Sequence, residues 1–145
     1  MQYTGSPLRR INHLVGEIDA LYHEAALRFG LPDSAMMVLY TVSVEGGVCP
    51  IGEIVRQCGV SKQTINSALR RLEADGVIAL SPQGGKSKCV HLTEAGEALA
   101  HSTVCRLIEM ENGILSSWTA EEQTQYLSLM QRYHDAFQAG VEELA

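Results

Sequence analysis

The stretch from Ile51 to Leu92 constrains the fold of this chain most, because it contains the signals of two consecutive helices and a β-hairpin. Gly59 stands where the first helix must end, since a residue without a Cβ readily adopts the left-handed conformation of a tight turn. Ser61 follows at the N-cap position, where its hydroxyl can accept a hydrogen bond from a free amide of the next helix. The stretch therefore predicts a short helix, a tight turn and a longer helix that ends at Asp75 and Gly76.

The longer helix of this pair is amphipathic. Its apolar face consists of Ile65, Ala68, Leu69 and Leu72, at the three- and four-residue spacing of a helix. Its other face is polar and basic, and side chains of these types hydrogen-bond to base edges and phosphates. This face carries Lys62, Gln63, Thr64, Asn66, Ser67, Arg70 and Arg71.

A β-hairpin is predicted after this helix. Residues 77–80 are apolar and β-prone, and 88–92 form the expected returning strand. The segment 81–87 between them contains Pro82, Gly84 and Gly85, which favour a turn. A helix-turn-helix followed by a hairpin is a winged helix, so the predicted fold class is mostly α with a small β-hairpin wing.

Long helices are predicted on both sides of the winged helix. An apolar stripe from Leu8 to Phe29 lies between Pro7, which suits a first helical turn, and the helix-ending Gly30. Asp33 is the expected N-cap of a second helix through about Val44. Thr93 is expected to begin one long helix through about Ser116. A capping-box pattern from Thr119 to Glu122 begins the last helix.

These elements predict a single domain over residues 1–145. Within it, 33–92 form the winged helix-turn-helix and 93–116 a connecting helix. The segments 6–30 and 117–145 are predicted dimerisation helices, because a small winged helix offers little surface to cover their apolar faces. We therefore expect a two-fold homodimer in which the helices from both ends of the chain pair.

The net charge of −6 is unevenly distributed along the chain. Residues 50–92 contain six basic and three acidic residues, a net charge of +3, whereas the remainder contains five basic and fourteen acidic residues, a net charge of −9. Because the local field governs phosphate binding, an acidic total does not exclude a nucleic-acid partner. The positive patch is modest, which favours a dimer that doubles it.

The order of these elements resembles the MarR family of bacterial transcription regulators. The closest matches are Leu72-Glu73, Gly76-Val77-Ile78 and the run from Leu92 to Gly96. The likeness extends to the flanking helices and implies a dimer that binds double-stranded DNA. One departure lies in the wing, where the family usually has an Asp-x-Arg tip and this chain has Gly84-Gly85-Lys86. Lys86 supplies a point charge there but not the planar fork of an arginine.

The predicted DNA-binding residues lie on the second helix and the wing. Gln63, Thr64 and Asn66 are the predicted base readers, and Ser61 and Ser67 belong to the same polar face. Lys62, Arg70 and Arg71 are the predicted phosphate contacts, although either arginine could reach a guanine. Lys86 and Lys88 are expected at the backbone or minor groove. The competing interpretations are an ordinary solvated helix and a solvated turn.

The resemblance also implies a small-molecule effector pocket. In MarR-like dimers such a pocket lies between the dimerisation helices and the DNA-binding lobe, and it often takes phenolic or other aromatic anions. The residues that we expect to line it are Tyr22, Met36, Met37, Tyr40 and Trp118. Methionine and aromatic residues at helical spacing are also common core residues, and this alternative stays open.

Metal and redox sensing are weaker alternatives. His101, Cys105 and Glu109 follow at i, i+4 and i+8, a spacing that places potential zinc ligands on one face of a continuous helix. The four cysteines are Cys49, Cys58, Cys89 and Cys105, and none forms a CxxC pair. Cys58 is the candidate for a reactive thiol, because it has the basic residues Arg56 and Lys62 near it in the sequence. We expect free structural thiols and no cofactor.

The remaining function classes find little support in the sequence. It contains no nucleophile elbow, P-loop or HExxH motif, so no enzyme is predicted. No apolar run approaches a membrane span, and the predicted location is the cytoplasm. The predicted function is a sequence-specific repressor that binds a pseudo-palindromic operator and is released by a small aromatic effector. The alternative is a winged-helix protein-interaction module without a specific DNA target.

Overall fold

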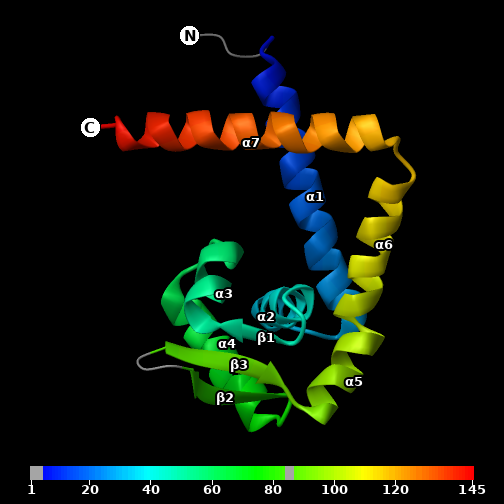
Figure 1. Cartoon of the computed structure of the whole chain (residues 1–145), viewed down its shortest axis with the longest axis vertical. Helices are drawn as coiled ribbons and strands as arrows, with labels where there is room; N and C mark the ends of the chain where they lie inside the picture. Colours follow the sequence, from blue (N-terminus) through cyan, green and yellow to red (C-terminus); the bar gives the residue numbers. More distant parts are fainter. Residues whose placement is uncertain (1–4, 84–86) are drawn as a thin grey trace. The chain divides into compact units, whose positions relative to one another are not determined.

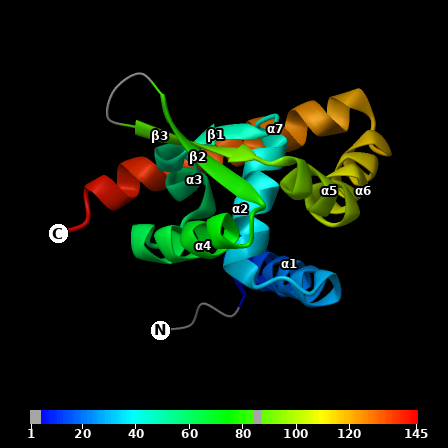
Figure 2. The ribbon, with the colours of Figure 1, turned by 90° about the horizontal axis from the view of Figure 1, so that it is seen from below.

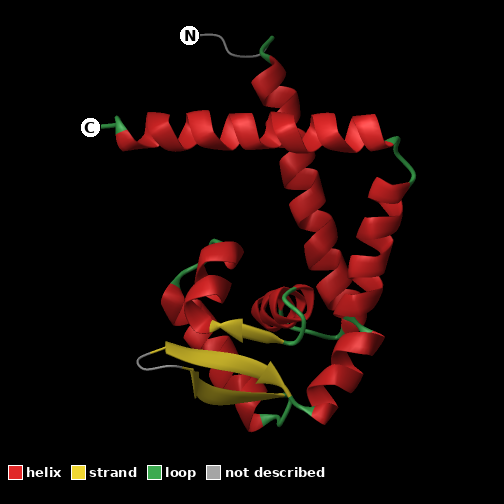
Figure 3. Cartoon of the chain, viewed as in Figure 1, coloured by secondary structure: helices red, strands yellow, loops and turns green. Residues whose placement is uncertain are grey.

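A computed structural model describes residues 5–83 and 87–145, which contain seven helices and three strands (Figures 1 and 3). By contacts the chain divides into two compact units, Met1–Ile108 and Glu109–Ala145. The helices are α1 (Pro7–Phe29), α2 (Asp33–Val44), α3 (Ile51–Cys58), α4 (Lys62–Ala74), α5 (Glu94–Ser102), α6 (Val104–Ser116) and α7 (Ala120–Glu142). The strands are β1 (Val48–Pro50), β2 (Ile78–Gln83) and β3 (Ser87–Leu92).

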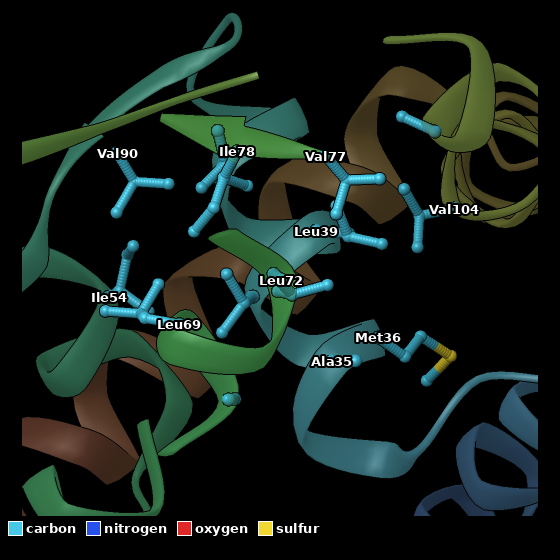
Figure 4. Close-up of a cluster of buried hydrophobic side chains, with 14 of the residues drawn as sticks. Ala35, Met36, Leu39, Ile54, Leu69, Leu72, Val77, Ile78, Val90 and Val104 are labelled. Carbon is cyan, nitrogen blue, oxygen red and sulfur yellow. The ribbon is translucent and has the colours of Figure 1, made fainter. Parts of the chain in front are cut away.

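The core of the first unit is built around α2, against which α3, α4 and the sheet pack. Val38, Leu39 and Val42 of α2 are completely buried. Figure 4 shows Leu39 among side chains from the other elements, including Ile54 of α3 and Val90 of β3. Full burial of one aliphatic side chain contributes roughly 1.5–3 kcal/mol, so this cluster holds the helix-turn-helix in place.

The sheet is antiparallel with the strand order β1-β3-β2. Val90 of the central strand pairs with Cys49 of β1 on one side and with Leu80 of β2 on the other. The predicted winged helix is therefore confirmed, and β1 adds a third strand to the expected hairpin.

The two wing strands extend into the segment 81–87, which the sequence predicted to be a turn. Pro82 lies within β2 opposite Lys88. Proline cannot donate a backbone hydrogen bond, but β2 is an edge strand, where proline is tolerated. The predicted tip at Gly84, Gly85 and Lys86 falls outside the described residues.

The single helix predicted over 93–116 is divided into α5 and α6 at Thr103. Thr103 has φ −129° and ψ −94°, far from helical values. Its buried hydroxyl donates to the carbonyl of Leu99 at 2.7 Å, a local hydrogen bond of the kind that competes with helix geometry. The next helix, α6, continues without interruption through Gly113.

The prediction that Asp33 caps α2 was wrong. Pro32 occupies the N-cap position, no side chain caps the helix, and Asp33 is its first residue. The Asp33 carboxylate instead lies 2.7 Å from Nδ1 of His23 in α1. This contact joins α1 to the beginning of α2.

The predicted capping box at the start of α7 is present. The Thr119 amide donates to Glu122 at 2.9 Å, and the Glu122 amide donates to the Thr119 hydroxyl at 3.1 Å. These bonds, the one from the backbone above all, lower the pKa of the Glu122 carboxyl. Both residues are exposed, so the box defines where α7 begins rather than anchoring it to a core.

The helices α1 and α7 each carry a stripe of apolar side chains that the chain itself leaves exposed. On α1 these are Leu8, Ile11, Val15 and Ile18, each between 47% and 53% exposed. On α7 they are Tyr126, Met130, Tyr133, Phe137 and Val141. No residue of α7 is buried. Among the described helices, none combines the length and apolar character needed to cross a membrane.

Candidate nucleic-acid interface

The turn between α3 and α4 fixes the start of the candidate recognition helix. Gly59 has φ +65°, a left-handed conformation that favours glycine. Ser61 caps α4, because its hydroxyl accepts from the Thr64 amide at 3.1 Å. The Thr64 hydroxyl lies 2.8 Å from the same Ser61 oxygen. The Thr64 hydroxyl thus contributes to the cap, which reduces its availability to a base.

The amphipathic pattern predicted for α4 agrees with the burial of its side chains. Ile65, Ala68, Leu69 and Leu72 are buried. Of the polar positions, only Asn66 is partly buried, and the exposed ones are Lys62, Gln63, Thr64, Ser67, Arg70 and Arg71. Seen from below, α4 lies beside the strands with one side open to solvent (Figure 2). This arrangement leaves the polar face accessible to a ligand.

A cleft of about 580 Å³ lies between α4 and the wing strands. Three cationic side chains line it: Lys62 and Arg70 of α4, and Lys88 of β3. No acidic residue is among the described lining residues. The others are Gln63 and Asn66, which are polar, and Ile51, Leu69 and Leu80, which are apolar. The cleft therefore combines positive charge with two amide side chains, a composition suited to a polyanion.

The structure divides the predicted DNA-binding residues into groups. Lys62, Gln63, Asn66, Arg70 and Lys88 meet at the cleft. Ser61, Thr64, Ser67 and Arg71 belong to α4 or its cap but do not line the cleft. Lys86 lies outside the described residues. The sequence placed Lys88 on the wing. It gave no signal that Lys88 lines the same cleft as Lys62 and Asn66 of α4.

A second hollow, of about 230 Å³, contains four of the five predicted effector residues. Tyr22, Met36, Met37 and Tyr40 line it together with three residues that the sequence analysis did not include, Thr41, Gln57 and Cys58. Trp118 belongs to the second unit, where its ring makes an edge-to-face contact with Tyr126 at 5.3 Å. Thr41 comes from α2, and Gln57 and Cys58 come from the last turn of α3. These residues lie together only because α2 packs against α3, which the sequence alone does not indicate.

This second hollow, called the effector hollow after the predicted residues in it, has no charged side chain among its described lining residues. Its polar groups are bound locally: the Thr41 hydroxyl lies 3.6 Å from the Cys58 sulfur. Gln57 donates to Glu45 at 2.9 Å and to Glu53 at 3.0 Å, so the charges nearest to its amide are negative. This environment differs from one that would stabilise an anion.

The three weak candidates for metal ligands, His101, Cys105 and Glu109, do not lie on one continuous helix. The break at Thr103 separates His101 from Cys105. Across residues 5–83 and 87–145, no group of three or more His, Cys, Asp and Glu side chains could hold a metal ion.

Cys49 and Cys89 are buried, and Cys58 and Cys105 are half-buried. Burial, followed by the charges of Glu45 and Glu53, raises the pKa of the Cys49 thiol to about 11. Cys49 is consequently protonated at neutral pH and is a poor nucleophile. Cys58 is half-buried in the effector hollow.

The fold and the basic cleft define a winged helix-turn-helix protein. Residues 29–87 match the family model described as MarR family, a span that contains the helix-turn-helix and most of the wing. No curated protein sequence gave a match.

Solved structures similar to this chain come from MarR-type regulators. NMB1585, a MarR family regulator from Neisseria meningitidis, has a TM-score of 0.81 at 18% identity, over 94% of this chain and 96% of that one. BpsR from Bordetella bronchiseptica, whose DNA binding is regulated by 6-hydroxynicotinic acid, has a TM-score of 0.66 at 17% identity, over 93% of this chain and 97% of that one. MepR from S. aureus, solved in complex with DNA, has a TM-score of 0.64 at 20% identity, over 94% of this chain and 99% of that one.

Identities this low establish the shared fold, and the family match rests on residues 29–87. Together they confirm the resemblance seen in the sequence. The helix-turn-helix region thus matches the MarR family, and the chain as a whole shares the fold of the MarR-type regulators.

Proposed function

We propose that this chain is a sequence-specific DNA-binding repressor that acts as a homodimer and is released by a small molecule. The observation that carries the proposal is the cleft between α4 and β3, in which Lys62, Arg70 and Lys88 surround two amide side chains. In an electrostatic contact with DNA, each neutralised phosphate releases condensed counterions. Amides and guanidinium groups beside those cations can also bond to base edges.

The exposed apolar stripes on α1 and α7 support the dimer. A soluble chain rarely leaves so many large apolar side chains exposed along one helix unless a partner covers them. Two-fold symmetry would present two α4 helices to half-sites about one helical turn apart on a pseudo-palindromic operator. It would also double the modest positive charge of the cleft.

The second hollow supports the proposed release by a small molecule. Gln57 and Cys58, which line it, end α3 directly before the turn at Gly59. A ligand that prefers one arrangement of α2 and α3 would therefore change the position of α4, and it can act only through that difference in affinity. Among similar proteins, NadR was solved with 4-hydroxyphenylacetate and BpsR responds to 6-hydroxynicotinic acid.

A salt titration of DNA affinity tests the role of the cleft. The variants are Lys62→Ala and Lys88→Ala, and the control is Arg28→Ala, which removes a cation that pairs with Glu24 on the exposed side of α1. We expect each cleft variant to weaken binding of all sequences and to reduce the slope of log affinity against log salt by about 1 for each lost phosphate contact. The control should keep the wild-type slope. Unchanged slopes for both cleft variants would refute the proposed interface.

A further inference from the structure

The side chains of α4 form stripes with different surroundings. At about 100° per residue, Gln63, Ser67 and Arg70 share one line along the helix, because they stand at i, i+4 and i+7. That line lies opposite the buried Ile65, Ala68, Leu69 and Leu72, and all three of its residues are exposed. This central stripe, defined as Gln63, Ser67 and Arg70, therefore points away from the core.

Two flanks border the central stripe. Lys62 and Asn66 form the flank nearer the wing. With Lys88 of β3 they line the cleft, whose edge also includes Gln63 and Arg70 of the central stripe. Thr64 and Arg71 lie on the other flank, away from the cleft. A helix with its side chains is about 10–12 Å wide, close to the width of the major groove. When the helix enters the groove with the side opposite its core facing the DNA, its central stripe faces the bases. Its two flanks then face the two phosphate backbones.

The central stripe contains the chemistry for two specific base contacts. Nη2 of Arg70 lies 3.5 Å from the hydroxyl of Ser67, one turn earlier on the same stripe. In the unbound chain the guanidinium therefore lies along the stripe. The Gln63 amide has no hydrogen bond to any other described side chain, so both its donor and its acceptor are available. Arginine pairs with O6 and N7 of guanine, and glutamine pairs with N6 and N7 of adenine.

We infer, on the basis of the proposed function, that Arg70 reads a guanine and Gln63 reads an adenine in each half-site. Lys62, Asn66 and Lys88 contact the backbone strand that passes between α4 and the wing. Arg71 contacts the opposite backbone. The sequence made Gln63, Thr64 and Asn66 the base readers and Arg70 a phosphate contact that could also reach a guanine. The present assignment keeps Gln63, selects the guanine contact for Arg70 and moves Asn66 to the backbone. Thr64 loses that role because its hydroxyl belongs to the Ser61 cap.

The two neighbouring arginines allow a matched test. The full chain first selects its preferred duplexes from a random library, and the selected duplex then serves as the probe for Arg70→Lys and Arg71→Lys. Lysine keeps the charge but loses the planar fork that pairs with guanine. We expect Arg70→Lys to reduce the preference for one guanine in each half-site by about 10-fold or more. Arg71→Lys should change affinity equally for matched and mismatched duplexes.

Modified bases provide a second, independent readout. Replacing the selected guanine with 7-deazaguanine removes the N7 acceptor, and this change should weaken wild-type binding while leaving Arg70→Ala, which has no donor there, almost unaffected. Replacing the selected adenine with 7-deaza-adenine should likewise weaken wild-type binding and leave Gln63→Ala almost unaffected. An undiminished guanine preference in Arg70→Lys would overturn the inference while the proposed function stands. A selection that enriches no motif would overturn the proposed function, and the inference with it.

Discussion

Gly96 shows how one residue without a side chain positions the wing against the helix that follows it. A Cβ at this site would lie 1.9 Å from the Val77 carbonyl oxygen and 2.9 Å from its carbon. The neighbouring Thr93 strengthens the same contact, because its hydroxyl donates to the Gly76 carbonyl at 2.6 Å and accepts from the Gly96 amide at 3.0 Å. Glycine at position 96 therefore allows α5 to begin directly against the start of β2.

Gly96→Ala is accordingly expected to destabilise the fold by about 1–3 kcal/mol or more, since backbone must move to admit the methyl group. Urea denaturation followed by circular dichroism measures this loss. Gly52→Ala is the matched control, because its Cβ would meet no atom within 4 Å and it lies within α3. The control should be neutral or more stable by up to about 1 kcal/mol. Equal stability of the two variants would contradict the close packing at Gly96.

At the scale of elements, the effector hollow predicts a preference for uncharged ligands. Tyr22, Met37 and Cys58 line it, and within residues 5–83 and 87–145 no lysine, arginine or histidine does. Transfer of a carboxylate from water into such a site is costly without a partner of opposite charge. A one-ring phenol should therefore raise the melting temperature more than a benzoate of the same size, as measured by differential scanning fluorimetry.

A control for the ligand test is a variant that fills the hollow. Met37→Trp adds bulk among the lining side chains, and it should abolish the phenol-induced shift. Equal or larger shifts with benzoates would show that a cation reaches the ligand and would refute the neutral site. The neutral lining also contrasts with the aromatic anions that the family resemblance implied.

The boundaries of most elements could be predicted because their signals are local. Gly30, Gly59 and Gly76 all have positive φ at the ends of helices, where the sequence placed helix ends. The break at Thr103 could not be predicted, because it depends on a threonine hydroxyl bonding to its own helix in a buried setting. Pro82 suggested a turn, and only the position of β2 at the sheet edge explains its place in a strand.

The site was predictable to the extent that it follows helix periodicity. The polar face of α4 follows from residue spacing, whereas the sharing of one cleft by Lys88 and Asn66 depends on the register of β3 against β2 and on its packing over α4. The hollow lined by Gln57 and Cys58 likewise requires the packing of α2 on α3. Long-range packing of this kind has no local sequence signal.

At the scale of the whole molecule, the exposed stripes predict an obligate dimer. Ile18→Asp on α1 and Tyr133→Asp on α7 place a charge within each stripe, at positions that are half exposed in the single chain. Light scattering at micromolar concentration should give the mass of a dimer for the wild type and a lower average mass for both variants. The DNA affinity of both variants should fall together with their average mass, because a single protomer contacts only one half-site.

His13→Asp is the control for the dimer test, because it introduces the same side chain on the side of α1 opposite the apolar stripe. This variant should keep the dimeric mass. A wild type that is monomeric at micromolar concentration would contradict the assignment of both helices to dimerisation.

The charge distribution also belongs to this scale. A chain with a net charge of −6 should bind DNA through one face only, where Lys62, Arg70 and Lys88 lie together. The acidic remainder weakens non-specific attraction elsewhere on the surface. A protein of this kind should therefore depend more on base contacts than a uniformly basic one.

The most direct test of the central claim is fluorescence anisotropy with the purified chain at two salt concentrations. The probes are a duplex from the intergenic DNA upstream of its own gene and a scrambled duplex of equal length. The account predicts a preference of roughly 10³-fold or more for the native duplex, as specific regulators show. Equal, weak binding of both duplexes that disappears with added salt would contradict it and would favour a protein-interaction module.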